Sequence, residues 1–182
     1  MGKIRPENYP VTRATEFFFD TNIWILIFAP NGDFQKGDQQ KYSKLFENIL
    51  EKDAPIYINS IIISEFANAL LRRDYNIWKD DQKKIFNLKV DFKKDYFGTS
   101  DYLNSYSIVK SSLDSIFSIS SVIKLSDNFS TTDMAHITGN CPKLDFNDSY
   151  ISHLVNTRKF NFVSNDTDFH TNLIHGDFIT TR

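Results

Sequence analysis

Residues 17–28 read Phe-Phe-Phe-Asp-Thr-Asn-Ile-Trp-Ile-Leu-Ile-Phe, an aromatic run and a second apolar run separated by three polar residues. A short run that is apolar at every position is typical of a strand buried on both faces of a parallel sheet. Asp20-Thr21-Asn22 ends this strand, and residues 23–28 begin a helix. The stretch therefore predicts the passage from strand to helix of an α/β fold, with an acid at the carboxyl end of the strand.

Strands and helices alternate outward from this stretch. Apolar runs predict further strands at 55–58, 121–125, 160–163 and 178–181. Helical spacing of apolar residues or a capping residue predicts helices at 39–53, 60–73, 77–92, 109–117, 131–137, 145–158 and 168–174. This alternation is typical of an α/β fold with a mainly parallel sheet. The chain has no linker of domain size, so residues 1–182 are expected to form a single domain.

The composition argues against several classes of protein. The formal net charge of −2 does not suit a polybasic nucleic-acid arm, although local charge still decides binding. The one cysteine, Cys141, can form neither an intramolecular disulfide nor a cysteine-based zinc site. The longest apolar run, residues 23–29, is far shorter than the ~20 residues that span a membrane. Residues 1–10 lack the apolar core of a signal peptide, so a reducing, cytoplasmic setting is expected.

Two acids stand at the ends of apolar strands. Asp20 follows the strand at 17–19, and Asp166 stands just after the strand at 160–163. Ligands of open α/β sheets bind at the carboxyl ends of the strands, so on neighbouring strands these carboxylates would converge. Their repulsion in a partly dry crevice requires a proton or a cation. A hard divalent cation with oxygen ligands is the simplest solution.

Two helices offer further acids to the same site. Asp148 lies on the apolar stripe of Ile151 and Val155, and Glu65 lies one turn into its own helix. Asp168 follows the second strand-end acid by two residues and could assist it. Three or four acids from separate segments can serve one or two Mg²⁺ ions, which activate a water and neutralise charge on a phosphate under in-line attack.

Each acid also has an ordinary structural explanation. Asp20 could simply cap a helix, and Asp145 with Asp148 resembles a capping pair. Glu65 could be a solvated helix residue, and the two acids in residues 165–168 are common in turns. We favour capping for Asp145, whereas capping and metal ligation are equally open for Asp148. The acids taken together, in this order, favour a site.

The same set resembles the pattern of the PIN-domain nucleases. That pattern has an Asp-Thr-Asn after the first strand, a Ser/Thr-Glu pair on a helix after the second, an Asp near the start of a late helix, and a Thr/Ser-x-Asp-x-Asp-Phe after the next strand. In this chain it reads Phe19-Asp20-Thr21-Asn22, Ser64-Glu65-Phe66, Phe146-Asn147-Asp148-Ser149-Tyr150-Ile151 and Ser164-Asn165-Asp166-Thr167-Asp168-Phe169. The match runs from about residue 17 to residue 169.

The resemblance implies a three-layer α/β/α sandwich around a parallel sheet, with extra helices inserted at roughly 78–117. It also implies a Mg²⁺- or Mn²⁺-dependent endoribonuclease, in which a metal-activated water hydrolyses RNA phosphodiester bonds. The catalytic and metal-binding acids carried over by motif are Asp20, Glu65, Asp148 and Asp166, with Asp168 as a further acid. Asn22 and Ser164 match polar positions that orient those acids, and Ser164 keeps the hydroxyl of the more frequent Thr.

Among PIN proteins, the chain looks nearest to the VapC-type toxins of bacterial toxin–antitoxin systems. That likeness implies a homodimer, an RNA substrate and a small antitoxin protein as partner. Toxins of this class tend to be shorter than this chain, and the inserted helices are where it departs from them.

A segment rich in cations follows the Ser-Glu motif. The RNA-binding candidates in it are Arg72, Arg73, Lys83, Lys84 and Lys89. Contacts with phosphates need cations but no particular base, so this segment could hold RNA. A solvated helix face explains the same charges equally well, because several aspartates interrupt them.

Two other functions compete with the nuclease. A Mg²⁺-dependent phosphatase of the haloacid-dehalogenase kind also begins with an acid after a strand, but it needs a second Asp two residues later, where Asn22 stands. A catalytically inactive PIN-like module that binds or scaffolds is the other alternative. It would be favoured if the acids failed to converge.

Overall fold

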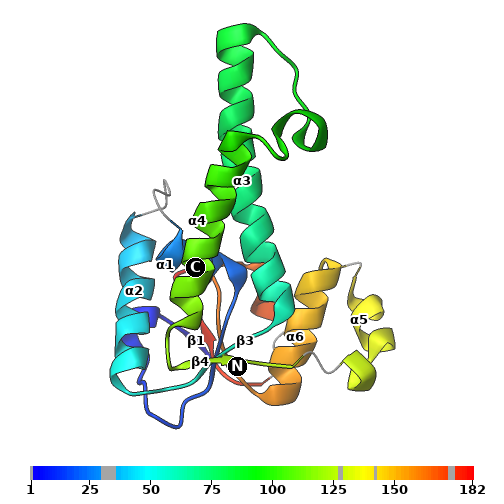
Figure 1. Ribbon diagram of the computed structural model, residues 1–182. Helices are drawn as coiled ribbons and strands as arrows, with labels where there is room; N and C mark the ends of the chain where they lie inside the picture. Colours follow the sequence, from blue (N-terminus) through cyan, green and yellow to red (C-terminus); the bar gives the residue numbers. More distant parts are fainter. Residues whose placement is uncertain (1, 30–35, 127–128, 142, 172–174) are drawn as a thin grey trace.

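The computed structural model describes residues 2–29, 36–126, 129–141, 143–171 and 175–182. One sheet of six parallel strands lies at its centre, in the order β1-β6-β5-β2-β3-β4 (Figure 1). The strands are β1 (Lys3–Ile4), β2 (Phe17–Phe19), β3 (Ile56–Ile58), β4 (Val122–Lys124), β5 (Asn161–Val163) and β6 (Phe178–Ile179). The predicted α/β fold with a parallel sheet is confirmed.

Helices flank this sheet on both sides, with α2 on one side and α6 on the other (Figure 1). The helices are α1 (Thr21–Phe28), α2 (Lys36–Glu51), α3 (Ser60–Phe86), α4 (Ser100–Phe117), α5 (Met134–Asn140) and α6 (Phe146–Arg158). Single short turns of helix are η1 (Pro6–Asn8), η2 (Phe92–Tyr96), η3 (Phe129–Thr131) and η4 (Asp168–Thr171). The layers are therefore helix, sheet and helix.

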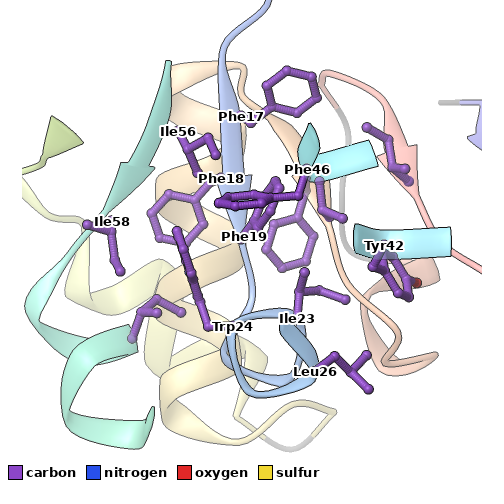
Figure 2. Packing of buried hydrophobic residues seen from close by; sticks show 14 of the residues in the cluster. Phe17, Phe18, Phe19, Ile23, Trp24, Leu26, Tyr42, Phe46, Ile56 and Ile58 are labelled. Carbon is purple, nitrogen blue, oxygen red and sulfur yellow. The ribbon is translucent and has the colours of Figure 1, made fainter. Parts of the chain in front are cut away.

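The strand β2 is apolar at every position because both of its faces are covered. Phe18 stacks on Phe160 and Phe162, with ring centroids 5.9 and 6.3 Å apart. The neighbouring Phe19 points to the other face, where its ring lies 5.4 Å from that of Trp24 (Figure 2). Aromatic packing of this kind adds to the hydrophobic stabilisation of the sheet. Aromatic contacts therefore cover both faces of β2, which lies inside the sheet between β5 and β3.

The strands beside β2 are β3 and β5, and both run parallel to it. The carboxyl ends of all three strands consequently meet at one edge of the sheet. Asp20 follows β2, Asn59 follows β3, and Ser164 follows β5. Polar side chains from three separate parts of the chain are therefore brought to one edge, where ligands of such sheets bind.

Helix α3 differs from its prediction. We expected two helical stretches, at 60–73 and 77–92, and the structure has one helix of 27 residues. Its N-cap is Asn59, whose side chain accepts a hydrogen bond from the backbone N–H of Ile62. Helix α3 ends at Asn87, which adopts a left-handed conformation with φ of 52°. The distal half of α3 and the segment that follows it, which carries η2, project from the sheet as an arm, while α4 runs back beside the proximal half of α3 (Figure 1).

Smaller differences concern the ends of elements. The strand β1 was not predicted, because a strand of two residues leaves too short a pattern to recognise. Helix α5 begins at Met134 instead of Thr131, since Asp133 caps it by accepting from the N–H of His136. The helix predicted at 168–174 is a short turn, η4, as far as residue 171, and residues 172–174 lie outside the described residues. Within the described residues, no helix has the length and apolar character that crossing a membrane requires.

Candidate functional site

Asp20 is a buried carboxylate at the carboxyl end of β2, and only 6% of it is exposed. It is the N-cap of α1, since its Oδ1 accepts a hydrogen bond from the backbone N–H of Thr21 at 2.7 Å. Its Oδ2 accepts from Ser164 Oγ at 2.7 Å and from Asn22 Nδ2 at 2.6 Å. Asp20 can therefore cap α1 and also take part in a site, because its two carboxylate oxygens face different partners.

Ser164 and Asn22 connect Asp20 to the loop that carries Asp166. Ser164 Oγ accepts a hydrogen bond from the backbone N–H of Asp166 at 3.0 Å. Asn22 Oδ1 accepts from the backbone N–H of Asn165 at 3.2 Å. The two polar residues thus lie between the acids, where they fix the position of one carboxylate relative to the loop that carries the other.

Glu65 reaches the same edge from the second turn of α3. Its Oε2 accepts a hydrogen bond from the hydroxyl of Thr21, and its Oε1 accepts from Asn147 Nδ2, both at 2.6 Å. Glu65 is partly buried and is not a solvated helix residue. Sequence reasoning assigned no role to Thr21 or Asn147. The sequence did give one signal for a role of these two residues, since Thr21 stands beside Asp20 and Asn147 beside Asp148 within the quoted motifs.

Asp148 lies in the first turn of α6, and its backbone N–H donates to Oδ1 of Asp145 at 2.9 Å. Asp145 is therefore the cap, as the sequence favoured. The carboxyl group of Asp148 accepts no hydrogen bond from any described residue and is partly buried. It is thus the acid whose oxygens have no protein partner in the described part of the chain.

The pKa values of two acids show that the group is electrostatically coupled. Burial raises the pKa of Asp20 from 3.8 to about 6, and the charges of Glu65 and Asp166 add to the rise against the hydrogen bonds that lower it. Burial also raises the pKa of Asp148 from 3.8 to about 7, with smaller contributions from the charges of Asp145, Asp20, Asp166 and Glu65. Asp20, Glu65, Asp148 and Asp166 form what we call the acid cluster.

Asp168 stands apart from the acid cluster in its exposure. Its side chain is exposed, and its backbone N–H donates to Oδ1 of Asp166 at 2.9 Å. This hydrogen bond holds the turn after β5 and orients one carboxylate oxygen of Asp166. A turn residue with this geometry supports the neighbouring acid through the backbone.

The acid cluster suits some cations better than others. Within the described residues, no three His, Cys, Asp or Glu side chains are grouped closely enough to surround a metal ion. A closed zinc site is therefore not formed by these residues as they stand. Mg²⁺ keeps several of its waters and takes only one or two carboxylates directly. Carboxylates that repel one another at longer range fit a hydrated hard cation of this kind.

The cationic candidates on and after α3 lie at different distances from the acid cluster. Arg72 is two turns beyond Glu65, whereas Lys83 and Lys84 lie in the last turn. At a rise of 1.5 Å per residue, Lys83 is about 27 Å from Glu65 along the helix axis. Cations in the last turn also stabilise a helix by interaction with its dipole. Of the candidates on α3, Arg72 and Arg73 therefore lie nearest to Glu65 along the helix.

Arg73 and Lys89 differ from Arg72 in their surroundings. The guanidinium of Arg73 forms an ion pair with the carboxylate of Asp74, at 3.0 Å. Lys89 is exposed and follows the end of α3. Of the five RNA-binding candidates, Arg73 is thus bound to a neighbouring acid, and Lys89 lies with Lys83 and Lys84 at the distal end of the arm.

We expect the metal-free chain to lose stability as the pH rises from about 5 to about 8. The pKa values of Asp20 and Asp148 are higher in the folded chain than their ordinary 3.8, so the fold binds these protons more tightly than the unfolded chain does. The stabilisation is complete below about pH 3.8 and is lost as the pH passes through 6 to 7. Calorimetric melting in EDTA should show a midpoint lower by about 5 °C at the higher pH. A midpoint that rises across this interval would refute the coupling.

Comparison with known proteins bears on the fold. A chain of the solved complex described as VapBC2 from Rickettsia felis, bound to a DNA fragment from their promoter, is 16% identical, with a TM-score of 0.54. The match covers 92% of this chain and 100% of that chain. A chain of FitAB bound to an IR36 DNA fragment is 12% identical, with a TM-score of 0.48 and coverage of 90% and 94%.

The sequence matches no family model and no curated protein. At this level of identity, the likeness to the VapBC2 chain concerns the arrangement of helices and strands and not individual residues. It extends over nearly the whole chain. The chain therefore has the three-layer α/β/α fold of a protein in the VapBC2 complex.

Proposed function

We propose that this chain is an endoribonuclease that depends on a divalent cation, Mg²⁺ or Mn²⁺, and hydrolyses RNA phosphodiester bonds. The observation that carries the proposal is the acid cluster itself. Four acids from four separate segments interact at the carboxyl edge of a parallel sheet, and two of them have pKa values raised toward neutrality. Perturbed carboxylates gathered at such an edge are typical of functional sites.

The roles of the acids follow from their surroundings. Asp20, Asp148 and Asp166 would hold the cation, and Glu65 would hold a second ion or position the attacking water. The cation would supply charge neutralisation at the phosphate and a water of lowered pKa.

Fixed hydrogen bonds keep these acids ready for their roles. Thr21 and Asn147 hold both oxygens of Glu65, while Ser164 and Asn22 hold one oxygen of Asp20. Asp166 is oriented by the backbone N–H of Asp168. The acidic side chains are therefore already in place when a phosphate binds, and little rearrangement of charged groups is needed.

The biological role that we propose is that of the toxin in a toxin–antitoxin pair, acting in the cytoplasm. Its partners would be RNA, a small antitoxin protein and a second copy of the chain. The fold shared with a protein of the VapBC2 complex supports this role by analogy, as does the order of the acidic motifs.

A second candidate is a catalytically inactive module that binds a partner through the same fold. One observation favours it: no three potential ligands of the described residues are grouped closely enough to enclose a metal ion. The phosphatase alternative is less suited, because the position that would need a second acid holds Asn22, whose amide donates to Asp20.

Cleavage of RNA and its dependence on metal test the proposal. The purified chain should cleave labelled tRNA or mRNA in the presence of Mn²⁺ or Mg²⁺. Excess EDTA should reduce the rate at least about a hundredfold, because the acids alone cannot offset the charge of the phosphate. Readdition of Mn²⁺ should restore it. Undiminished cleavage in EDTA would refute the cation requirement, and failure to cleave any RNA of a broad panel would favour the inactive module.

A further inference from the structure

A pocket separate from the acid cluster lies on the arm between α3 and η2. Its volume is about 370 Å³, within the range of about 300–1,000 Å³ typical of small-ligand sites. Helix α3 supplies Asn68, Arg72, Tyr75 and Asn76 to its wall, and η2 supplies Phe92 and Lys93. Aromatic rings, amides and cations thus meet in one hollow.

This pocket is aligned with the acid cluster along α3. Counted from Glu65, Asn68 is at i+3, Arg72 at i+7 and Asn76 at i+11. Residues at these spacings lie on one face of a helix. The rise from Glu65 to Arg72 is about 10 Å. A polymer bound at Glu65 and running along this face would therefore reach the pocket with a short extension.

The aromatic wall of the pocket is held by ring contacts and a hydrogen bond. The rings of Tyr75 and Phe92 meet edge to face, with centroids 5.2 Å apart and an interplanar angle of 82°. The hydroxyl of Tyr75 donates to the carbonyl of Val90 at 2.9 Å, and Tyr96 packs against both rings. Fixed aromatic rings at a surface pocket offer the kind of platform on which nucleobases stack.

The cations of the pocket are available for a ligand. Arg72 and Lys93 are exposed, and neither side chain makes an ion pair or hydrogen bond with a described residue. The one acid in the wall is Asp91, whose Oδ1 accepts from the backbone N–H groups of Lys93 and Lys94 at 2.9 and 3.0 Å. These N–H groups offset part of its charge. Two cations against one partly neutralised carboxylate favour an anionic ligand.

We propose that this pocket binds a nucleotide of single-stranded RNA that flanks the cleaved phosphate. The base lies against Tyr75 and Phe92, and the backbone phosphates lie against Arg72 and Lys93. The amides of the pocket offer hydrogen bonds to the edge of the base. This inference rests on the proposed nuclease function for its substrate, and it adds a place where the enzyme selects an unpaired stretch of RNA.

Binding of a labelled oligouridylate of about ten nucleotides to the full chain, in EDTA to prevent cleavage, tests the cationic half of the pocket. The double substitution Arg72→Ala with Lys93→Ala should weaken binding roughly tenfold. It should also reduce the slope of log affinity against log salt by about 1.4, since each phosphate contact on a single strand contributes about 0.7. Unchanged affinity and slope would overturn the assignment.

A charge-matched control separates local contacts from total charge. Lys44 and Lys110 are exposed, with 60% and 68% of their side chains accessible, and each pairs only with an acid on its own helix. Lys44→Ala with Lys110→Ala removes the same two charges and should leave RNA affinity within about twofold. An equal loss of affinity in this control would show that binding is diffuse and that the pocket is not a site.

The aromatic half is tested by Phe92→Leu, which keeps an apolar side chain and removes the ring. Oligouridylate binding should weaken roughly fivefold or more, whereas binding of inorganic polyphosphate, which has no bases, should be unchanged. Thermal melting checks that the variant is folded. Equal weakening for both polyanions, or none for the oligouridylate, would overturn base stacking in the pocket.

The outcome for the pocket can be distinguished from the outcome for the nuclease. A chain that cleaves RNA but binds oligouridylate equally well after the Arg72 and Lys93 substitutions refutes the pocket alone. A chain that binds oligouridylate through these residues but never cleaves RNA refutes the nuclease and supports the pocket. Absence of oligouridylate binding by the unmodified chain overturns the pocket whatever the cleavage assay shows.

Discussion

Asp20→Asn is expected to lower the rate of RNA cleavage at least about a thousandfold, the upper end of the loss seen when one electrostatic group is removed from a reacting site. Asp20 is the most buried member of the acid cluster and faces both Glu65 and Asp166. An amide of the same shape carries no charge to hold a cation. The rate should be measured under single-turnover conditions, so that slow release of product does not hide the effect.

The variant should remain folded, which makes the result interpretable. Asparagine is as good an N-cap as aspartate, so its Oδ1 can still accept from the N–H of Thr21. Its amide can donate to Ser164 Oγ in place of accepting from it, whereas the hydrogen bond from Asn22 Nδ2 to this position is lost. Because burial raises the pKa of the natural carboxyl group to about 6, the neutral amide removes an unfavourable charge at neutral pH. This gain opposes the loss of the hydrogen bond from Asn22, so the metal-free variant should melt within about 5 °C of the natural chain.

A matched control is available on the surface. Asp114 pairs with Lys110 on α4, and 64% of its side chain is exposed. Asp114→Asn removes one carboxylate far from the strand ends and should leave cleavage within about twofold. Cleavage by the Asp20 variant within tenfold of the natural rate would show that this carboxylate takes no part in the reaction.

The sequence predicted the framework of the fold because its central signals are local. Three consecutive phenylalanines before an acid indicate a doubly buried strand, and the apolar spacing on α2 and α6 indicates their inward faces. The positions of Asp20 and Asp166 at strand ends then place them at one edge once the strands are parallel neighbours, as β2 and β5 are. These predictions required only periodicity and the direction of the strands.

The contacts that hold the site could not be predicted from the sequence. The hydrogen bonds of Glu65 with Thr21 and Asn147 join residues 44 and 82 positions apart. No local pattern marks such a pair, because the partners meet only when α1, α3 and α6 pack at the same edge. The motif spacing identified Glu65 as a candidate acid, but it could not predict which residues would donate hydrogen bonds to its two carboxylate oxygens.

The arm shows a different limit of predicting structure from the sequence, which concerns where helix α3 ends. The polar, cation-rich stretch after Arg73 weakens the apolar pattern on α3, so the pattern predicts that the helix ends there. Its continuation depends on a second set of aromatic contacts, in which Tyr75 and Trp78 on α3 pack against Tyr96 beyond the helix. Tertiary packing therefore extends a helix that local propensity leaves undecided.

Mn²⁺ binding by the acid cluster is the second large effect that we expect. One or two Mn²⁺ ions should bind to each chain near pH 7.5, where the acids have largely lost their protons. Because a ligand that binds only the folded state stabilises it, the melting temperature should rise with Mn²⁺ concentration. Near pH 5, protons occupy Asp20 and Asp148, whose pKa values are raised to about 6 and about 7, and the rise should be much smaller.

Isothermal titration of the natural chain, Asp20→Asn and Asp114→Asn with Mn²⁺ at about pH 7.5 tests most directly whether acids from separate segments form one cation site. We predict saturable binding to the natural chain and to Asp114→Asn, and affinity at least about a hundredfold weaker for Asp20→Asn. Equal binding by all three proteins, or no binding by the natural chain, would contradict the site on which the proposed function depends.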